Sequence, residues 1–220
     1  MALDTGSAQV ALALAAFFAA PATLIAPEGL LDPGVPYIAG PGELAVLPGS
    51  GLALRLKNRL LAGRLGFDRA AFAPGFRDLL ATRATCRLAC QLVLSPAARL
   101  AEVQRHLAAA VHQTRLKSAV LKSDREALAA VLGEAAWQSG LRQAPVFATA
   151  LAGLAPSGPA AITDPGAILD HAGGVAVALV SAEDPLLGRI LTARLPGAHR
   201  LAPLTDSQQA AAWRLIESLP

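Results

Sequence analysis

The chain has 220 residues, of which 50 are alanine and 38 are leucine, a composition that favours helices. Hydrophobic residues make up 54% and charged residues 16%, so the chain can build a core and is not expected to be disordered. The net charge of +3 conceals an uneven distribution, with −4 over residues 1–54, +10 over 55–125 and −3 over 126–220.

Caps, prolines and apolar spacing predict helices in the first half of the chain. Ser7 is expected to begin a helix that Pro21 stops, and six prolines make residues 21–49 a surface loop. Further helices are expected from Ser50 to Gly63 or Gly66, over 76–94, and after Ser95-Pro96. In the last of these, the predicted core stripe is Leu100, Val103, Leu107 and Val111.

Similar signals continue through the second half of the chain. Ser123 with Glu126 forms a predicted capping box for one helix ending at Gly140, whose expected core face is Leu128, Val131, Leu132 and Ala135. Shorter helices are expected over 145–154, after Asp164-Pro165, after Asp184-Pro185 and after a Thr205–Gln208 capping box. Residues 175–180 are the one run with strand character, because Gly173-Gly174 before them disfavours a helix.

The fold class that these signals predict is all-α, a compact bundle of about eight or nine helices with a proline-rich N-terminal loop and at most one short strand. The Pro156–Pro159 stretch is the best internal boundary. We therefore expect a main helical domain over 1–155, holding the proline-rich segment 21–49, and a C-terminal helical subdomain over 156–220 packed on it. A single domain is the alternative.

Catalytic, cofactor and metal motifs are scarce, so the chain is predicted not to be an enzyme and to bind no cofactor. No Gly-Lys-Ser or Gly-Lys-Thr phosphate loop occurs, and His106 and His112 are six residues apart, which points them in different directions on a helix. Cys86 and Cys90 are expected to pack as small hydrophobic residues. This cysteine usage favours the cytosol.

The uncharged run 5–27 is interpreted as a buried helix and a proline stop. A secretory signal would need a basic start, and the only charge before this run is Asp4. A membrane span would need about 20 strongly apolar residues, whereas this run is rich in alanine and is broken by Pro21. Neither an export signal nor a span is therefore expected.

The basic middle block has two interpretations. Its charges are either solvated groups along the edges of amphipathic helices or a positive surface for an acidic partner. Nucleic-acid binding is not expected, because the basic helices carry no interleaved aromatics and no helix-turn-helix pattern. The candidate partner-binding residues in this block are Arg99, Arg105, Arg115, Lys117 and Lys122.

One stretch carries a family resemblance. Phe18 is followed by Pro21, the apolar pair Leu24-Ile25, Pro27 and Leu30. This pattern resembles the N-terminal pattern of the sorting-platform protein K family of type III secretion systems (the SctK or YscK family). That family usually has an aromatic and a histidine where this chain has Leu24 and Ala26.

The resemblance implies a non-enzymatic cytosolic adaptor of a type III secretion injectisome. Such an adaptor joins the cytoplasmic domain of the inner-membrane ring to the pod proteins that carry the export ATPase. It would lie close to the membrane without spanning it. The N-terminal residues expected to contact partners are Phe18, Pro21, Leu24, Pro27 and Leu30. The alternative is a helical regulatory or nucleic-acid-binding protein that uses the basic middle block.

Overall fold

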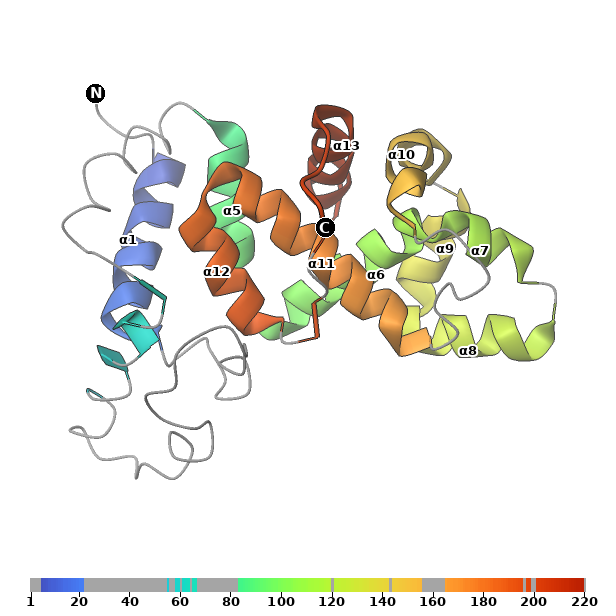
Figure 1. Ribbon diagram of the computed structural model, residues 1–220, viewed down its shortest axis with the longest axis horizontal. Helices are drawn as coiled ribbons and strands as arrows, with labels where there is room; N and C mark the ends of the chain where they lie inside the picture. Colours follow the sequence, from blue (N-terminus) through green and yellow to red (C-terminus); the bar gives the residue numbers. More distant parts are fainter. Residues whose placement is uncertain are drawn as a thin grey trace. The chain divides into compact units, whose positions relative to one another are not determined.

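The described part of the chain is all-α in this computed structural model (Figure 1). The structure describes residues 5–21, 55, 58–59, 61–63, 65–66, 83–119, 121–142, 144–155, 165–195, 197–198 and 201–219. Within these residues it has eleven helical elements and no strand, a few more helices than the sequence predicts. Among them, none combines the length and the apolar character that a membrane crossing would need.

The chain groups into two compact units, which we call unit 1 and unit 2. Unit 1 comprises residues 1–96 and 180–196, and unit 2 comprises 97–179 and 197–220. The predicted domain boundary at 155/156 lies at the edge of a stretch, 156–164, outside the described residues, and it stays a prediction.

The described part of unit 1 contains three main helices, α1 (Thr5–Ala19), α5 (Ala84–Leu94) and α12 (Pro185–Arg194). Helix α5 packs against both α1 and α12. Val10, Leu14 and Phe17 recur at helical spacing on α1 and are buried. The stop at Pro21 is confirmed, because α1 ends at Ala19.

Side chains at helix ends hold α12 and α5 in place. Asp184 Oδ1 accepts hydrogen bonds from the backbone N–H groups of Leu186 and Leu187 at 2.8 and 3.0 Å, which confirms the predicted cap. At the other end of α12, the Arg194 guanidinium donates to the carbonyls of Val93 and Ser95 at the end of α5. These carbonyls have no intrahelical partners, so the arginine satisfies them.

Unit 2 surrounds α6 (Ala97–Val111), whose apolar stripe is buried as predicted. Around α6 lie α7 (Gln113–Ser118), α8 (Lys122–Leu132), α9 (Glu134–Arg142), α10 (Ala144–Leu151), η3 (Ala152–Leu154) and α13 (Asp206–Glu217). The capping box of α13 is confirmed, with Thr205 N–H donating to Gln208 Oε1 at 2.8 Å. Trp213, Leu215 and Ile216 on α13 are buried as expected.

Several local predictions are wrong. Ser7 lies inside α1, which begins at Thr5, and Ala135, expected on a core face, is exposed. Residues 175–180 lie inside α11 (Pro165–Glu183), which continues through Gly173-Gly174. In the segment expected to be one helix over 76–94, α5 begins at Ala84 after the extended backbone of Arg83, and residues 76–82 lie outside the described residues. The helix expected over 123–140 is broken at Gly133, whose φ of +76° ends α8, and Ser123 lies inside α8 rather than capping it.

Candidate partner-binding groove

Helices α7, α8 and α9 lie together in unit 2 (Figure 1). A groove opens among their side chains. Its volume is about 510 Å³. All seven lining residues stand on these three helices: Leu116 and Lys117 on α7, Arg125, Glu126 and Ala129 on α8, and Trp137 and Leu141 on α9. The groove therefore combines an apolar lining with three charged side chains.

Two glycines give α9 its place beside α7 and α8. Gly133 ends α8 with a backbone conformation that favours glycine, and Trp137 N–H then donates to the Gly133 carbonyl at 3.0 Å in the first turn of α9. Gly140 lets the helices approach closely, because a Cβ there would lie 2.9 Å from both Ala109 Cβ and Leu116 Cδ1. The buried Leu116 thus rests directly on the backbone of α9.

Arg125 ties α8 to the end of α7. Its Nε–H donates to the Ala119 carbonyl at 2.7 Å, and Ala119 is the C-cap of α7. A cation at this position also stabilises the negative end of the helix dipole. The terminal amino groups of Arg125 have no acidic partner among the described residues, so they are available at the rim of the groove.

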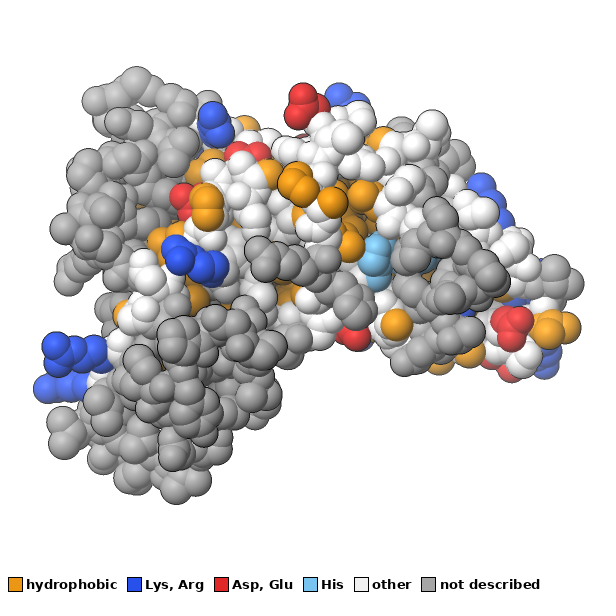
Figure 2. Space-filling view, viewed as in Figure 1, with side chains coloured by type: hydrophobic (Ala, Val, Ile, Leu, Met, Phe, Trp, Pro, Cys, Tyr) orange, Lys and Arg blue, Asp and Glu red, His pale blue; other side chains and the backbone are white. Residues whose placement is uncertain are grey.

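The charge around the groove is mixed but predominantly basic. Helices α7 and α8 carry four basic side chains against two acidic ones. Lys122 Nζ lies 3.6 Å from Glu126 Oε1, an exposed pair that contributes about 0–1 kcal/mol. Lys117 is exposed and has no ion-pair partner within the described ranges. Figure 2 shows basic, acidic and hydrophobic side chains close together in the region of α7 and α8.

The structure divides the basic residues that the sequence grouped together. Lys117 lines the groove and Lys122 pairs with the groove residue Glu126, while Arg115 stands in the last turn of α7. Arg105 is exposed on α6 and does not line the groove.

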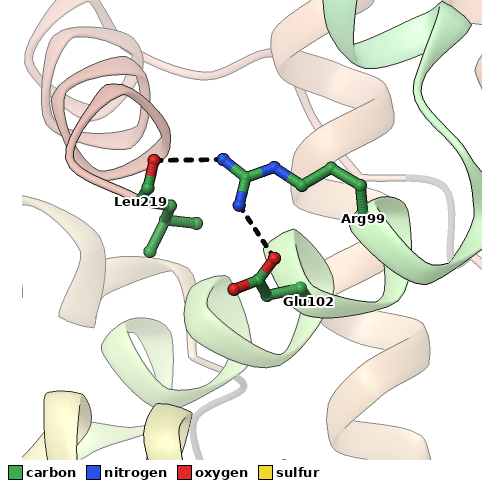
Figure 3. A network of polar contacts seen from close by, with 3 residues as sticks. All are labelled: Arg99, Glu102 and Leu219. Atoms are coloured by element: carbon green, nitrogen blue, oxygen red, sulfur yellow. Dashed lines mark hydrogen bonds and ion pairs between the residues drawn. The ribbon is translucent and has the colours of Figure 1, made fainter.

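Arg99 has a structural role at the start of α6 (Figure 3). Its Nη1 donates to Glu102 Oε2 at 2.8 Å, and its Nη2 donates to the Leu219 carbonyl at 3.1 Å. Leu219 follows the end of α13, so Arg99 joins α6 to the C-terminal end of that helix. Its charge is thereby engaged within unit 2.

Most of the N-terminal candidates lie beyond what the structure describes. Phe18 belongs to α1, but its side chain is not described, and Leu24, Pro27 and Leu30 lie outside the described residues. Pro21 is buried just after α1. Their role as partner contacts remains a prediction.

Sequence reasoning missed Arg125, Trp137 and Leu141. Trp137 and Leu141 are four residues apart, a spacing that places them on one helical face. That signal was present in the sequence. It was obscured because we expected one continuous helix over 123–140. The core face of such a helix differs from the core faces of two helices separated at Gly133.

A pair of histidines forms a second polar cluster, inside unit 2. His112 Nε2 lies 3.2 Å from His171 Nδ1, with the rings edge to face, and both side chains are buried. Burial, and then the neighbouring His171 and Arg115, lower the pKa of His112 to about 4. At neutral pH His112 is therefore uncharged, and one ring donates the shared hydrogen bond to the other. This geometry supports packing rather than proton transfer to a bound molecule.

The two cysteines lie in the core of unit 1. Cys86 and Cys90 are both buried and both free thiols, so their predicted role as small hydrophobic residues is confirmed. The hydrogen bond with Cys86, and then burial, raise the pKa of Cys90. In the described part of the chain, no three histidine, cysteine or acidic side chains cluster in a way that could hold a metal ion.

Comparison with known proteins adds no relative. A scan against protein-family models finds no match, and neither do searches of curated proteins and of solved structures. Function is therefore argued from the groove and from the sequence pattern of residues 18–30.

Proposed function

We propose that this protein is a non-enzymatic adaptor of a type III secretion injectisome. It would link the cytoplasmic domain of the inner-membrane ring to the pod proteins of the sorting platform and, through them, to the export ATPase. It would work in the cytoplasm, beside the inner membrane. The pattern from Phe18 to Leu30 carries the choice of apparatus.

The groove of α7, α8 and α9 supports the adaptor role. It offers Trp137 and Leu141 beside the cationic groups of Lys117 and Arg125. Tryptophan and arginine are enriched among residues that dominate protein–protein binding energy. The N-terminal pattern and the groove belong to separate segments of the sequence, and an adaptor needs contacts for two partners.

The alternative, a helical regulatory or nucleic-acid-binding protein, has less support. It needs the basic block to form one surface, whereas Arg99 is engaged with Glu102 and Leu219. Single-strand binding also needs several aromatic platforms, and Trp137 is the one aromatic residue in the groove lining. A mobility shift with DNA or RNA that weakens with salt would favour this alternative.

Co-purification from the source organism tests the proposal. The tagged full-length chain, expressed from its own locus, is expected to retain a ring protein and a pod protein encoded beside it. Deleting its gene should stop secretion of exported substrates, and restoring the gene should recover it. A gene neighbourhood without secretion components, together with unchanged secretion in the deletion strain, would refute the proposal.

A further inference from the structure

We propose that the groove of α7, α8 and α9 binds an acidic amphipathic helix of a partner protein. This inference rests on the proposed adaptor function and names the chemistry of the segment that one partner would contribute. The occupant carries leucine-like side chains on one face and glutamates or aspartates along the flank of that face.

The lining determines the apolar face of the occupant. Leu116, Ala129, Trp137 and Leu141 supply the apolar part of the groove, whose volume is about 510 Å³. Of these, Leu141 is 36% exposed. Apolar side chains of an incoming helix, spaced at i, i+3 or i+4 and i+7, would remove this surface from water.

The lining also favours a helix over an extended peptide. Extended peptides bind by adding a strand to an open sheet edge, which supplies main-chain hydrogen bonds. Every lining residue here stands on an α-helix, and none lies on a strand edge. Side-chain packing is thus the available mode of binding, and a helix presents its side chains in that way.

The rim determines the charge of the occupant. The Arg125 side chain is held by its Nε–H bond to the Ala119 carbonyl, which leaves both terminal amino groups oriented and without an acidic partner among the described residues. A held guanidinium binds a carboxylate with little further loss of entropy. Lys117 adds a second cation at the same groove, with no ion-pair partner in the part of the chain that the structure describes, and Glu126 is already paired with Lys122.

Fluorescence of Trp137 gives a direct test with the full-length chain. The protein has two tryptophans, so Trp213→Phe leaves Trp137 as the only one. The probe is a designed amphipathic peptide of about 18 residues, longer than the length at which isolated helices are marginal, with leucines on one face and glutamates along its flanks. As peptide is added, the emission wavelength of Trp137 is expected to shift until the shift saturates. Raising the salt concentration should weaken the binding.

Charge reversal makes the test specific. Lys117→Glu is expected to weaken binding of the acidic peptide about tenfold and to improve binding of a matched peptide with lysine in place of glutamate. Arg105→Glu makes the same change of charge at an exposed site on α6 outside the groove, and it should leave the affinity nearly unchanged. Leu141→Glu should weaken both peptides.

Several results would overturn the assignment. These are equal binding of the acidic and basic peptides, no binding of either, equal effects of Lys117→Glu and Arg105→Glu, or single-stranded DNA displacing the acidic peptide from Trp137. The outcomes also separate the two proposals. Ring and pod proteins that still co-purify with the Lys117→Glu, Leu141→Glu double variant refute the groove assignment alone. Acidic-peptide binding without secretion partners refutes the injectisome role alone.

Discussion

The imidazoles of His112 and His171 show how burial alters a titratable side chain in this protein. His112 lies in the turn after α6 and His171 lies on α11. The distance from His112 Nε2 to His171 Nδ1 is 3.2 Å. Charging His112 there would place a cation away from water and beside His171 and Arg115, which is why its pKa is lowered. His112 is therefore uncharged at neutral pH.

A pH dependence of stability follows from this shift. The folded pKa of His112 is about 4, against an ordinary value of 6.5, so the unfolded chain binds more protons between these values. Its contribution is fully present above about pH 6.5 and is lost as the pH falls towards 4. Between pH 7 and pH 5 the loss is about 2 kcal/mol of unfolding free energy.

Urea unfolding of the wild type and of His112→Gln at pH 7 and pH 5 measures this effect. Glutamine does not titrate, and its amide can still form a hydrogen bond with His171. The variant should therefore lose about 2 kcal/mol less than the wild type over this range. Burial also lowers the pKa of His106, so some dependence remains in the variant. Identical losses in the two proteins would contradict the assignment to His112.

Helical spacing in the sequence predicted only that His106 and His112 point in different directions. His106 and His112 were placed on a basic helix, and both are buried. Helical spacing within one segment says which residues share a face. It does not say that a second helix, α11, brings His171 against the turn after α6, because that contact joins residues far apart in the chain.

At the scale of elements, close helix packing depends on residues without side chains. Helix α9 crosses α6 with Gly140 at the contact, and Gln113 Nε2 donates to the Gly140 carbonyl at 3.1 Å. The same glycine supports Leu116, which lines the groove. Packing of α6 against α9 and the shape of the groove therefore depend on one position.

Gly140→Ala should destabilise the protein by about 1–3 kcal/mol, because its methyl group would overpack a filled interface. Both close neighbours, at 2.9 Å, are methyl carbons of buried side chains, which have little room to move. Gly153→Ala is the matched control, since the nearest atom to its Cβ is Gln208 Nε2 at 3.9 Å. Thermal unfolding compares the two; equal melting temperatures would show that the contact is not tight.

Local signals predicted the helix ends well where a side chain acts on its own backbone. The Asp184 cap and the Thr205–Gln208 capping box are such cases. The Ser123–Glu126 capping box failed because Leu121 already has the extended backbone of an N-cap, one residue before α8 begins. The break at Gly133 was missed because glycine is also tolerated inside helices, and only its φ distinguishes the two.

The groove shows the same limit on prediction. Lys117 and Lys122 were named from charge alone, and of the two Lys117 lines the groove. Predicting that Trp137 and Leu141 line the groove would have needed the knowledge that α9 is a separate helix. Predicting the position of the Arg125 guanidinium would have needed its hydrogen bond to Ala119. Composition thus indicated a positive surface, while the apolar lining depended on how three helices pack.

At the scale of the whole molecule, each compact unit draws on distant parts of the chain. Unit 2 combines residues 97–179 with 197–220, so its C-terminal helix α13 packs on α6 and α10. Arg99 reinforces this packing through the Leu219 carbonyl. A boundary at 155/156, which the Pro156–Pro159 stretch indicates, would separate elements that share one core.

Truncation at that boundary tests the grouping. A fragment of residues 1–155 lacks α13, whose buried Trp213, Leu215 and Ile216 each contribute about 1.5–3 kcal/mol. Their sum is comparable with the whole stability of a typical domain, and the fragment also loses the buried Ile168 and Val175 of α11. We expect it to unfold without cooperativity in urea and to bind a hydrophobic dye.

The matched fragment covers residues 97–220, which include all of unit 2 and both tryptophans. It should unfold cooperatively, with tryptophan emission like that of the full chain, because α13 can still cover α6 and α10. The reverse result, a cooperative 1–155 fragment and a molten 97–220 fragment, would mean that the core of α6 does not require α13. The division after residue 155 would then describe the folding units better than the grouping by contacts.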